Sequence, residues 1–154
     1  MINQFASAFG PIFDSAVHTV TDHIQEGPLT LGGIEFVITP TAEAFDIEIP
    51  EINAVYTHML GHNCHSIVAG ASHANAMIQQ LETYLQKECT LVLTSHYTPE
   101  DLKDVETKIA YLRELKVLAS RCGDAAEFKA AVKERFPGYG GENYLEMTSG
   151  FFFA

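Results

Sequence analysis

The sequence predicts an α/β (α+β) protein, a small β-sheet covered by helices. Short strand patterns bounded by glycine and proline cluster before residue 60, and longer patterns with apolar residues at helical spacing follow. One more uncharged strand pattern, Leu91–Thr94, lies between two of these helices. Early strands and later helices are typical of a sheet with helices packed on it. The 154 residues contain no linker or internal repeat, so we expect a single domain over residues 1–154.

The N-terminal part combines one helical pattern with four strand patterns. Apolar residues recur every three to four positions over Ile12–Ile24, and Gly27-Pro28 ends this predicted helix. Alternating apolar residues, separated by glycine and proline, predict the strands that follow. These strands are Leu29–Leu31 and Ile34–Thr39 around the turn Gly32-Gly33, then Phe45–Ile49 and Asn53–Met59.

The next part alternates helix and strand. Ser72 is the expected cap of a helix over His73–Gln86. The lack of charge in Leu91–Thr94 predicts a strand covered on both faces. Thr98 and Pro99 have the residue types of a helix cap and a first helical position, so we expect a helix from Pro99 to about Ser120.

The C-terminal part is predicted to be helical. Asp124 with Glu127 resembles a capping box for a helix that ends at Phe136, and Glu142–Thr148 is expected to form a short helix. The three aromatic residues 151–153 are costly to leave in water. We expect them to pack against the core or against a partner subunit.

Charge, cysteines and motifs exclude several classes of function. The chain has 9 Lys+Arg against 20 Asp+Glu, a formal net charge of -11, so it lacks the cations that nucleic acids and anionic membranes attract. No apolar stretch is long enough to predict a membrane span. The three cysteines lack CxxC spacing, which favours reduced thiols and a cytoplasmic protein. The motifs GxSxG, GxGxxG, HExxH and the P-loop are absent.

Histidines supply the candidate site. His58, His62 and His65 fall within eight residues, and His96 follows the last strand pattern. Imidazole and carboxylate groups bind first-row divalent metals, and Glu43 lies on the preceding segment. These five residues are the candidate ligands of zinc or another divalent metal. The alternative is that they have ordinary capping, core or surface roles and that no metal binds.

Three stretches resemble the C-terminal half of metallo-β-lactamase-fold hydrolases. They are PTAEAFDIEIP (Pro40–Pro50), AVYTHMLGHNCHSI (Ala54–Ile67) and VLTSHYTPED (Val92–Asp101). The resemblance is strongest to a subgroup that shares the GHxxHSIVAG and LTSHYTPED patterns, and it extends more distantly to the alkylsulfatase-like branch. It implies one half of an αββα sandwich whose metal site lies at the edge between two halves. The HxHxDH motif of the other half is absent from this sequence.

The resemblance also implies roles for individual residues. Glu43 matches the acid of a TEAP-type stretch, and His96 matches a late strand-end metal ligand. His62 and His65 match an HxxH pair. His58 falls where the branch has a strand-end glutamate ligand, so an imidazole replaces a carboxylate at that position. Without the first half of the fold, one chain is expected to carry at most part of a metal site.

Three functional hypotheses follow. The first is a free-standing half of this fold without a complete hydrolase site in the monomer. Such a half exposes one apolar sheet face, and exposure costs about 25 cal/mol per Å², so we expect a homo-oligomer. The second is a metal-dependent hydrolase with a site formed within or between subunits, where the metal supplies a hydroxide. The third is a module that binds a small ligand in an apolar pocket. The sequence identifies no small-molecule substrate.

Overall fold

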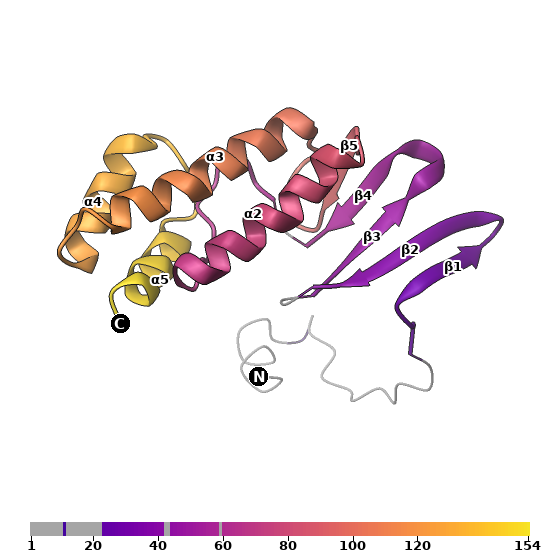
Figure 1. Cartoon of the computed structure of the whole chain (residues 1–154), viewed down its shortest axis with the longest axis horizontal. Coiled ribbons are helices and arrows are strands. Elements are labelled where there is room, and N and C mark those ends of the chain that lie inside the picture. Colours follow the sequence, from indigo (N-terminus) through magenta and orange to yellow (C-terminus); the bar gives the residue numbers. More distant parts are fainter. Residues whose placement is uncertain (1–10, 12–22, 42–43, 59) are drawn as a thin grey trace.

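The computed structural model describes residues 11, 23–41, 44–58 and 60–154, and its centre is a five-stranded sheet with the order β1-β2-β3-β4-β5 (Figure 1). The strands are β1 (Gly27–Leu31), β2 (Ile34–Pro40), β3 (Phe45–Ile49), β4 (Ala54–Thr57) and β5 (Leu91–Thr94). The helices are η2 (Pro50–Ile52, a short 3-10 helix), α2 (Gly70–Gln86), α3 (Leu102–Ala119), α4 (Ala125–Arg135) and α5 (Glu142–Phe152). None of the helices in the described ranges is long and apolar enough to cross a membrane.

The expected α+β class is therefore confirmed, with the strands early and the helices late. Of the predicted helix Ile12–Ile24, residues 12–22 lie outside the described part of the chain, and His23 and Ile24 are not helical. The four strands predicted before residue 60 are all present, and β3 has the predicted bounds. The last of these strands is shorter than predicted, because β4 ends at Thr57.

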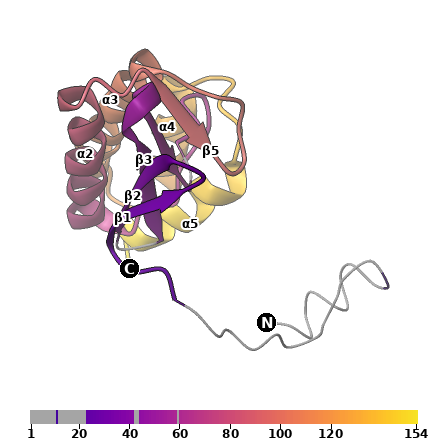
Figure 2. The same cartoon turned by 90° about the vertical axis from the view of Figure 1, so that its right-hand side faces the viewer.

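The sheet is antiparallel from β1 to β4 and parallel between β4 and β5. The hairpin between β1 and β2 turns at Gly32 and Gly33, whose φ angles of 60° and 85° suit the two-residue turn of a hairpin. A parallel pair needs a long crossover connection, and α2 lies within the connection from β4 to β5. Figure 2, which looks at the molecule from the strand end, shows α2 on one side of the strands.

The two faces of the sheet differ in chemistry. Successive residues of a strand point to opposite faces, and one face looks toward α2, because Asp46 accepts hydrogen bonds from Gln80 on that helix. The opposite face, which we call the outer face, has half-buried or exposed apolar and aromatic side chains on all five strands. They are Leu29, Leu31, Ile34, Phe36, Ile38, Phe45, Ile47, Ile49, Tyr56, Leu91 and Leu93.

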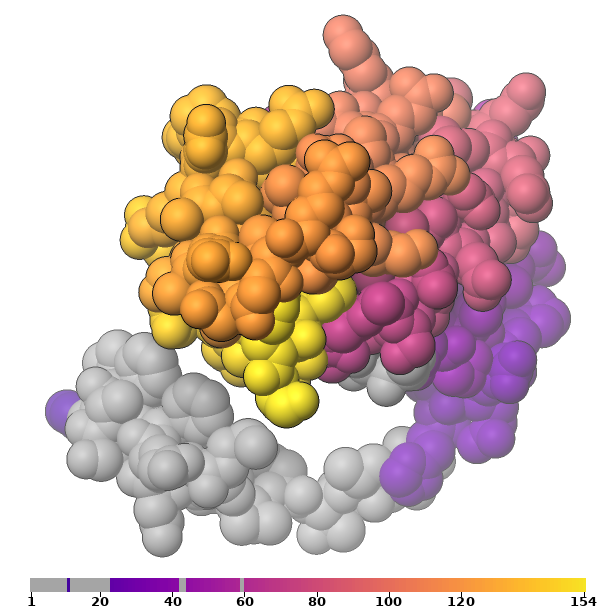
Figure 3. Space-filling view, turned by 60° about the vertical axis from the view of Figure 1, so that its left-hand side comes forward, coloured from indigo at the N-terminus to yellow at the C-terminus, as the bar shows by residue number. Residues whose placement is uncertain are grey.

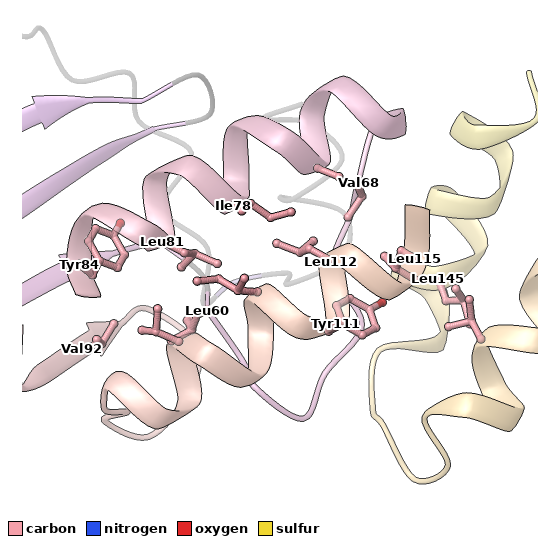
Figure 4. Close-up of a cluster of buried hydrophobic side chains, with 14 of the residues drawn as sticks. Leu60, Val68, Ile78, Leu81, Tyr84, Val92, Tyr111, Leu112, Leu115 and Leu145 are labelled. Carbon is pink, nitrogen blue, oxygen red and sulfur yellow. The ribbon is translucent and has the colours of Figure 1, made fainter. Parts of the chain in front are cut away.

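The hydrophobic core lies between the helices and the face of β4 and β5 that looks toward α2 (Figure 4). Helix α3 contributes apolar residues at helical spacing that are at most 4% exposed, namely Val105, Ile109, Leu112 and Leu115. Ile78 and Leu81 of α2 face this row, and Val55 and Val92 close the core from the strands. Residues at this spacing share one face of a helix, so α3 buries a single apolar stripe against the core.

The start of α3 differs from the prediction. Helix α3 does not begin at Pro99, because Glu100 pairs with Val92 through two backbone hydrogen bonds of 2.8 and 2.9 Å and is held out of the helix. The cap is Asp101 rather than Thr98. Its side chain accepts from the N–H groups of the first turn, while Asp104 accepts from the Asp101 N–H, which makes a reciprocal capping box.

Two further predictions need correction. Helix α2 begins at Gly70, so Ser72 lies inside the helix and is not its cap. Strand β5 was expected to be covered on both faces, but it is an edge strand that pairs only with β4 among the named strands. Only Val92 of this strand is buried. The reason is that Leu91 and Leu93 belong to the outer face, which α2 does not cover.

The C-terminal aromatic residues pack partly inside the chain. Helix α5 is longer than predicted and includes Phe151 and Phe152. The rings of Phe152 and Phe153 contact Phe128 of α4 with centroid distances of 5.3 and 5.7 Å. Phe151 stays 48% exposed. Figure 3 shows this helical end of the molecule, where α5 lies next to both α4 and α2.

Truncation of the α3 core row should destabilise the protein strongly. Leu112 is fully buried, so Leu112→Ala should lower the free energy of unfolding by about 2–5 kcal/mol. Val117→Ala on the same helix removes a partly exposed side chain and should cost less than about 1 kcal/mol. Urea unfolding followed by circular dichroism measures both values. Equal losses for the two variants would contradict this view of the core.

Candidate functional site

The ends of the two parallel strands bring two predicted site residues together. Thr57 of β4 lies opposite Thr94 of β5, so the residues just beyond, His58 and His96, meet at one edge of the sheet. Their ring centroids are 5.1 Å apart with an interplanar angle of 77°, and the Ser95 N–H donates to the His58 carbonyl at 3.2 Å. Both histidines are exposed. Two accessible imidazoles at this distance could bind the same metal ion or anionic group.

His62 lies in a different environment. Its Nδ1 is 2.7 Å from Glu100 Oε1 and 3.2 Å from Asp104 Oδ1. The Glu100 side chain is only 2% exposed and also accepts from the backbone N–H groups of Gly61 and His62 at 3.0 and 2.8 Å. This carboxylate therefore fixes the loop after β4 against the start of α3.

The trio His62, Glu100 and Asp104 is also a candidate metal group. Within the described ranges, it is the one set of three or more His, Cys, Asp or Glu side chains whose ligand atoms lie within 4.8 Å of one another. The His62 Nδ1 already contacts one oxygen of Glu100 and one of Asp104, and the other Asp104 oxygen accepts from the Asp101 N–H. The sequence predicted His62 as a ligand but gave no signal for the two carboxylates as its partners.

His65 is a core residue. It is 2% exposed, its Nδ1 lies 3.0 Å from the Tyr111 hydroxyl, and its ring contacts Tyr139. Burial, with a smaller contribution from the charge of Lys108, lowers the pKa of His65, which favours the neutral imidazole. Glu43, the fifth predicted ligand, lies outside the described residues. The four predicted histidines thus fall into three environments, and only His58 and His96 are in contact.

A buried lysine lies behind the loop and was not singled out by the sequence analysis. Lys108 is 1% exposed, and its Nζ donates to the Cys64 carbonyl at 2.6 Å and to Ser66 Oγ at 3.0 Å. It also lies 4.8 Å from the centre of the Tyr111 ring. Its position within the apolar spacing of α3 was the signal that could have revealed its burial.

The edge offers an incomplete set of metal ligands. Structural zinc sites use four protein ligands, and catalytic sites use three with an open position for water. The pair His58 and His96 supplies two, and His62 is engaged by carboxylates. The imidazole chemistry therefore fits a divalent transition metal, but the described part of one chain supplies only some of the ligands such a site needs.

The buried lysine predicts an unusual dependence of stability on pH. Burial lowers the pKa of Lys108 from 10.5 to about 8. Between these values the unfolded chain binds more protons than the folded chain, so this group makes the free energy of unfolding rise with pH by at most about 1.4 kcal/mol per unit. Below pH 8 both states are protonated and this contribution is constant. Lys108→Met should remove the rise.

Urea unfolding between pH 7 and pH 10 measures this effect as a difference between the wild type and Lys108→Met. Other groups act in the same range with the opposite sign, since burial raises the pKa of the Cys89 thiol. Because both proteins contain Cys89, subtraction isolates the lysine. If the free energy of unfolding changed with pH in the same way in both proteins, the assignment of this effect to Lys108 would be wrong.

Solved structures share this fold. The chain matches the stereoselective inverting sec-alkylsulfatase Pisa1 from Pseudomonas sp. with a TM-score of 0.56 and 18% identity over 84% of this chain and 25% of that one. It matches a double mutant of that enzyme with a TM-score of 0.53 and 17% identity over 86% of this chain and 26% of that one. No protein-family model and no curated protein sequence matches. The chain thus spans about a quarter of the alkylsulfatase, and its fold is similar to part of a metallo-β-lactamase-fold enzyme.

Proposed function

We propose that this chain acts as half of a metallo-β-lactamase-like sandwich, without a complete hydrolase site in the monomer, and that it assembles with a second copy. The outer face of the sheet is the observation that carries this proposal. It spans all five strands and has no acidic or basic side chain. Leu31 and Phe45 on it are 56% and 46% exposed. A large contiguous apolar surface of this kind marks an interaction site.

A second sheet is the occupant that fits this face best. Sheets pack face to face about 10 Å apart, with their strands aligned to within about 30°, and a twofold axis lets one apolar patch meet itself. The net charge of -11 opposes association, but no acidic side chain lies on the outer face itself. The C-terminal tail is a weaker candidate for the contact, because Phe152 and Phe153 already pack on Phe128.

A matched pair of substitutions on β1 tests the assembly. Leu29 points to the outer face opposite Phe36, and its neighbour Thr30 points to the other face. Leu29→Glu should convert the assembly to monomer at micromolar concentration, because it buries an unpaired carboxylate in the contact. Thr30→Glu adds the same charge and should leave the assembly intact. Size-exclusion chromatography with light scattering measures the mass.

A monomeric wild type would refute the assembly outright. Equal masses for Leu29→Glu and Thr30→Glu would also contradict it, since both add one negative charge to β1 but only Leu29 lies on the outer face. Circular dichroism of both variants provides the folding control.

The contact between His58 and His96 favours a second candidate function, a metal-dependent hydrolase whose site is formed between subunits. Two imidazoles are too few for a zinc site, so groups from a second chain would have to complete it. A zinc or another divalent ion bound there would lower the pKa of a bound water and supply a nucleophile. Identities of 17–18% to the alkylsulfatase bear on the fold alone, so no substrate is carried over from that enzyme.

Metal analysis tests this second candidate. Protein purified without chelator should carry zinc or another divalent metal, and His58→Ala or His96→Ala should reduce the metal content at least tenfold. His23→Ala, which removes an exposed histidine before β1, should change nothing. Elemental analysis by mass spectrometry measures metal per chain. A metal-free wild type, or an unchanged content in His96→Ala, would exclude the site, and retention in a monomeric Leu29→Glu would place it within one chain.

A further inference from the structure

A groove of about 660 Å³ lies between α2 and the sheet, and it reaches the edge of the outer face at Phe45. One wall follows α2 from His73 and ends at Lys87, the residue just after the helix, a length of roughly 20 Å at 1.5 Å per residue. The opposite wall comes from β2, β3 and the end of β4. The volume is within the range of about 300–1,000 Å³ that is typical of small-molecule sites.

A buried carboxylate is part of the lining of the groove. Asp46 is 6% exposed and accepts hydrogen bonds from Gln80 Nε2 at 3.0 and 2.9 Å and from the Tyr84 hydroxyl. Both donors are neutral. No ion pair between described residues involves Asp46, and the nearby cation Lys87 pairs with Glu48. A buried charge that lacks an opposite charge favours a cationic ligand.

Both charged and apolar side chains line the groove. Glu48 and Lys87 line it with Asp46, whereas Ala76, Met77 and Ile67 supply apolar surface. The lining also includes polar side chains, namely Thr57, His58, Ser66 and His73. Ile67 is 37% exposed. A carboxylate and apolar surface within one groove suit a ligand with a charged head and an apolar tail.

We propose that this groove binds a small amphipathic organic cation, with an ammonium group at Asp46 and a short alkyl tail along Met77 and Ile67. The ammonium N–H groups would donate to the carboxylate in charge-assisted hydrogen bonds. The same carboxylate, with Glu48 beside Lys87, repels an anionic head. An alkyl sulfate of equal length therefore binds more weakly, although the fold is similar to that of an alkylsulfatase. The inference does not depend on the assembly, because Asp46, Met77 and Ile67 do not belong to the outer face, although Phe45 at its edge also lines the groove.

Titration calorimetry of the full chain with octylammonium, octyl sulfate and octan-1-ol tests the proposal, at concentrations where each amphiphile is monomeric. Octylammonium should bind at least tenfold more tightly than octyl sulfate. Asp46→Asn should weaken the binding of octylammonium at least tenfold and leave the affinity for octan-1-ol unchanged, because the shape of the groove is kept while the charge is lost. Glu106→Gln removes one exposed negative charge from α3, outside the groove, and should leave all three affinities unchanged.

A second variant tests the tail without altering the carboxylate. Ala76 is exposed on α2 and lines the groove. Ala76→Trp should therefore fill the space beside Met77 and weaken the binding of all three amphiphiles. Circular dichroism confirms that each variant is folded. Octyl sulfate binding as tightly as octylammonium, or equal loss in Asp46→Asn and Glu106→Gln, would overturn the proposal. Leu29→Glu should bind octylammonium normally, so failure of the assembly and failure of the groove are distinguishable.

Discussion

The parallel pairing of β4 with β5 determines most of the arrangement around it. Antiparallel neighbours need only a short turn, but this pair needs a crossover, and the connection that contains α2 meets this need. Val55 and Val92, which face each other in the pair, are fully buried under the helices. The same pairing places His58 beside His96 at the carboxyl edge. The core and the candidate metal edge thus have one structural origin.

Buried polar groups hold the loop between β4 and α2 in place. Glu100 accepts from two backbone N–H groups of this loop, and Lys108 donates to the Cys64 carbonyl a few residues later. Both side chains are almost fully buried, so each would be costly without its partners. Glu100 attaches the loop to the segment just before α3, and Lys108 attaches it to the first half of that helix. This attachment explains why two motif histidines, His62 and His65, are engaged within the chain and are not at the sheet edge.

Local patterns predicted the elements well, and long-range contacts explain the failures. Strands β3 and β5 have their predicted bounds, since alternation and lack of charge are properties of the strands themselves. The predicted start of α3 at Pro99 was wrong, because the pairing of Glu100 with Val92 is not visible in the local sequence. The contact of His58 with His96 agrees with their positions at strand ends, whereas the partners of His62 and the burial of Lys108 depend on how α3 packs. The motif resemblance indicated a partial metallo-β-lactamase-like fold, which the structural similarity supports.

The apolar outer face also has a thermodynamic consequence. Hydration of apolar surface is opposed mainly by entropy near room temperature, and its cost decreases on cooling. An assembly held by Phe36, Ile47 and Leu93 would therefore have a negative heat capacity of association and would loosen in the cold. The interactions inside each chain include buried charges and hydrogen bonds, which do not weaken on cooling in this way. Low temperature would thus weaken the contact between subunits, as it also weakens the apolar core of each chain.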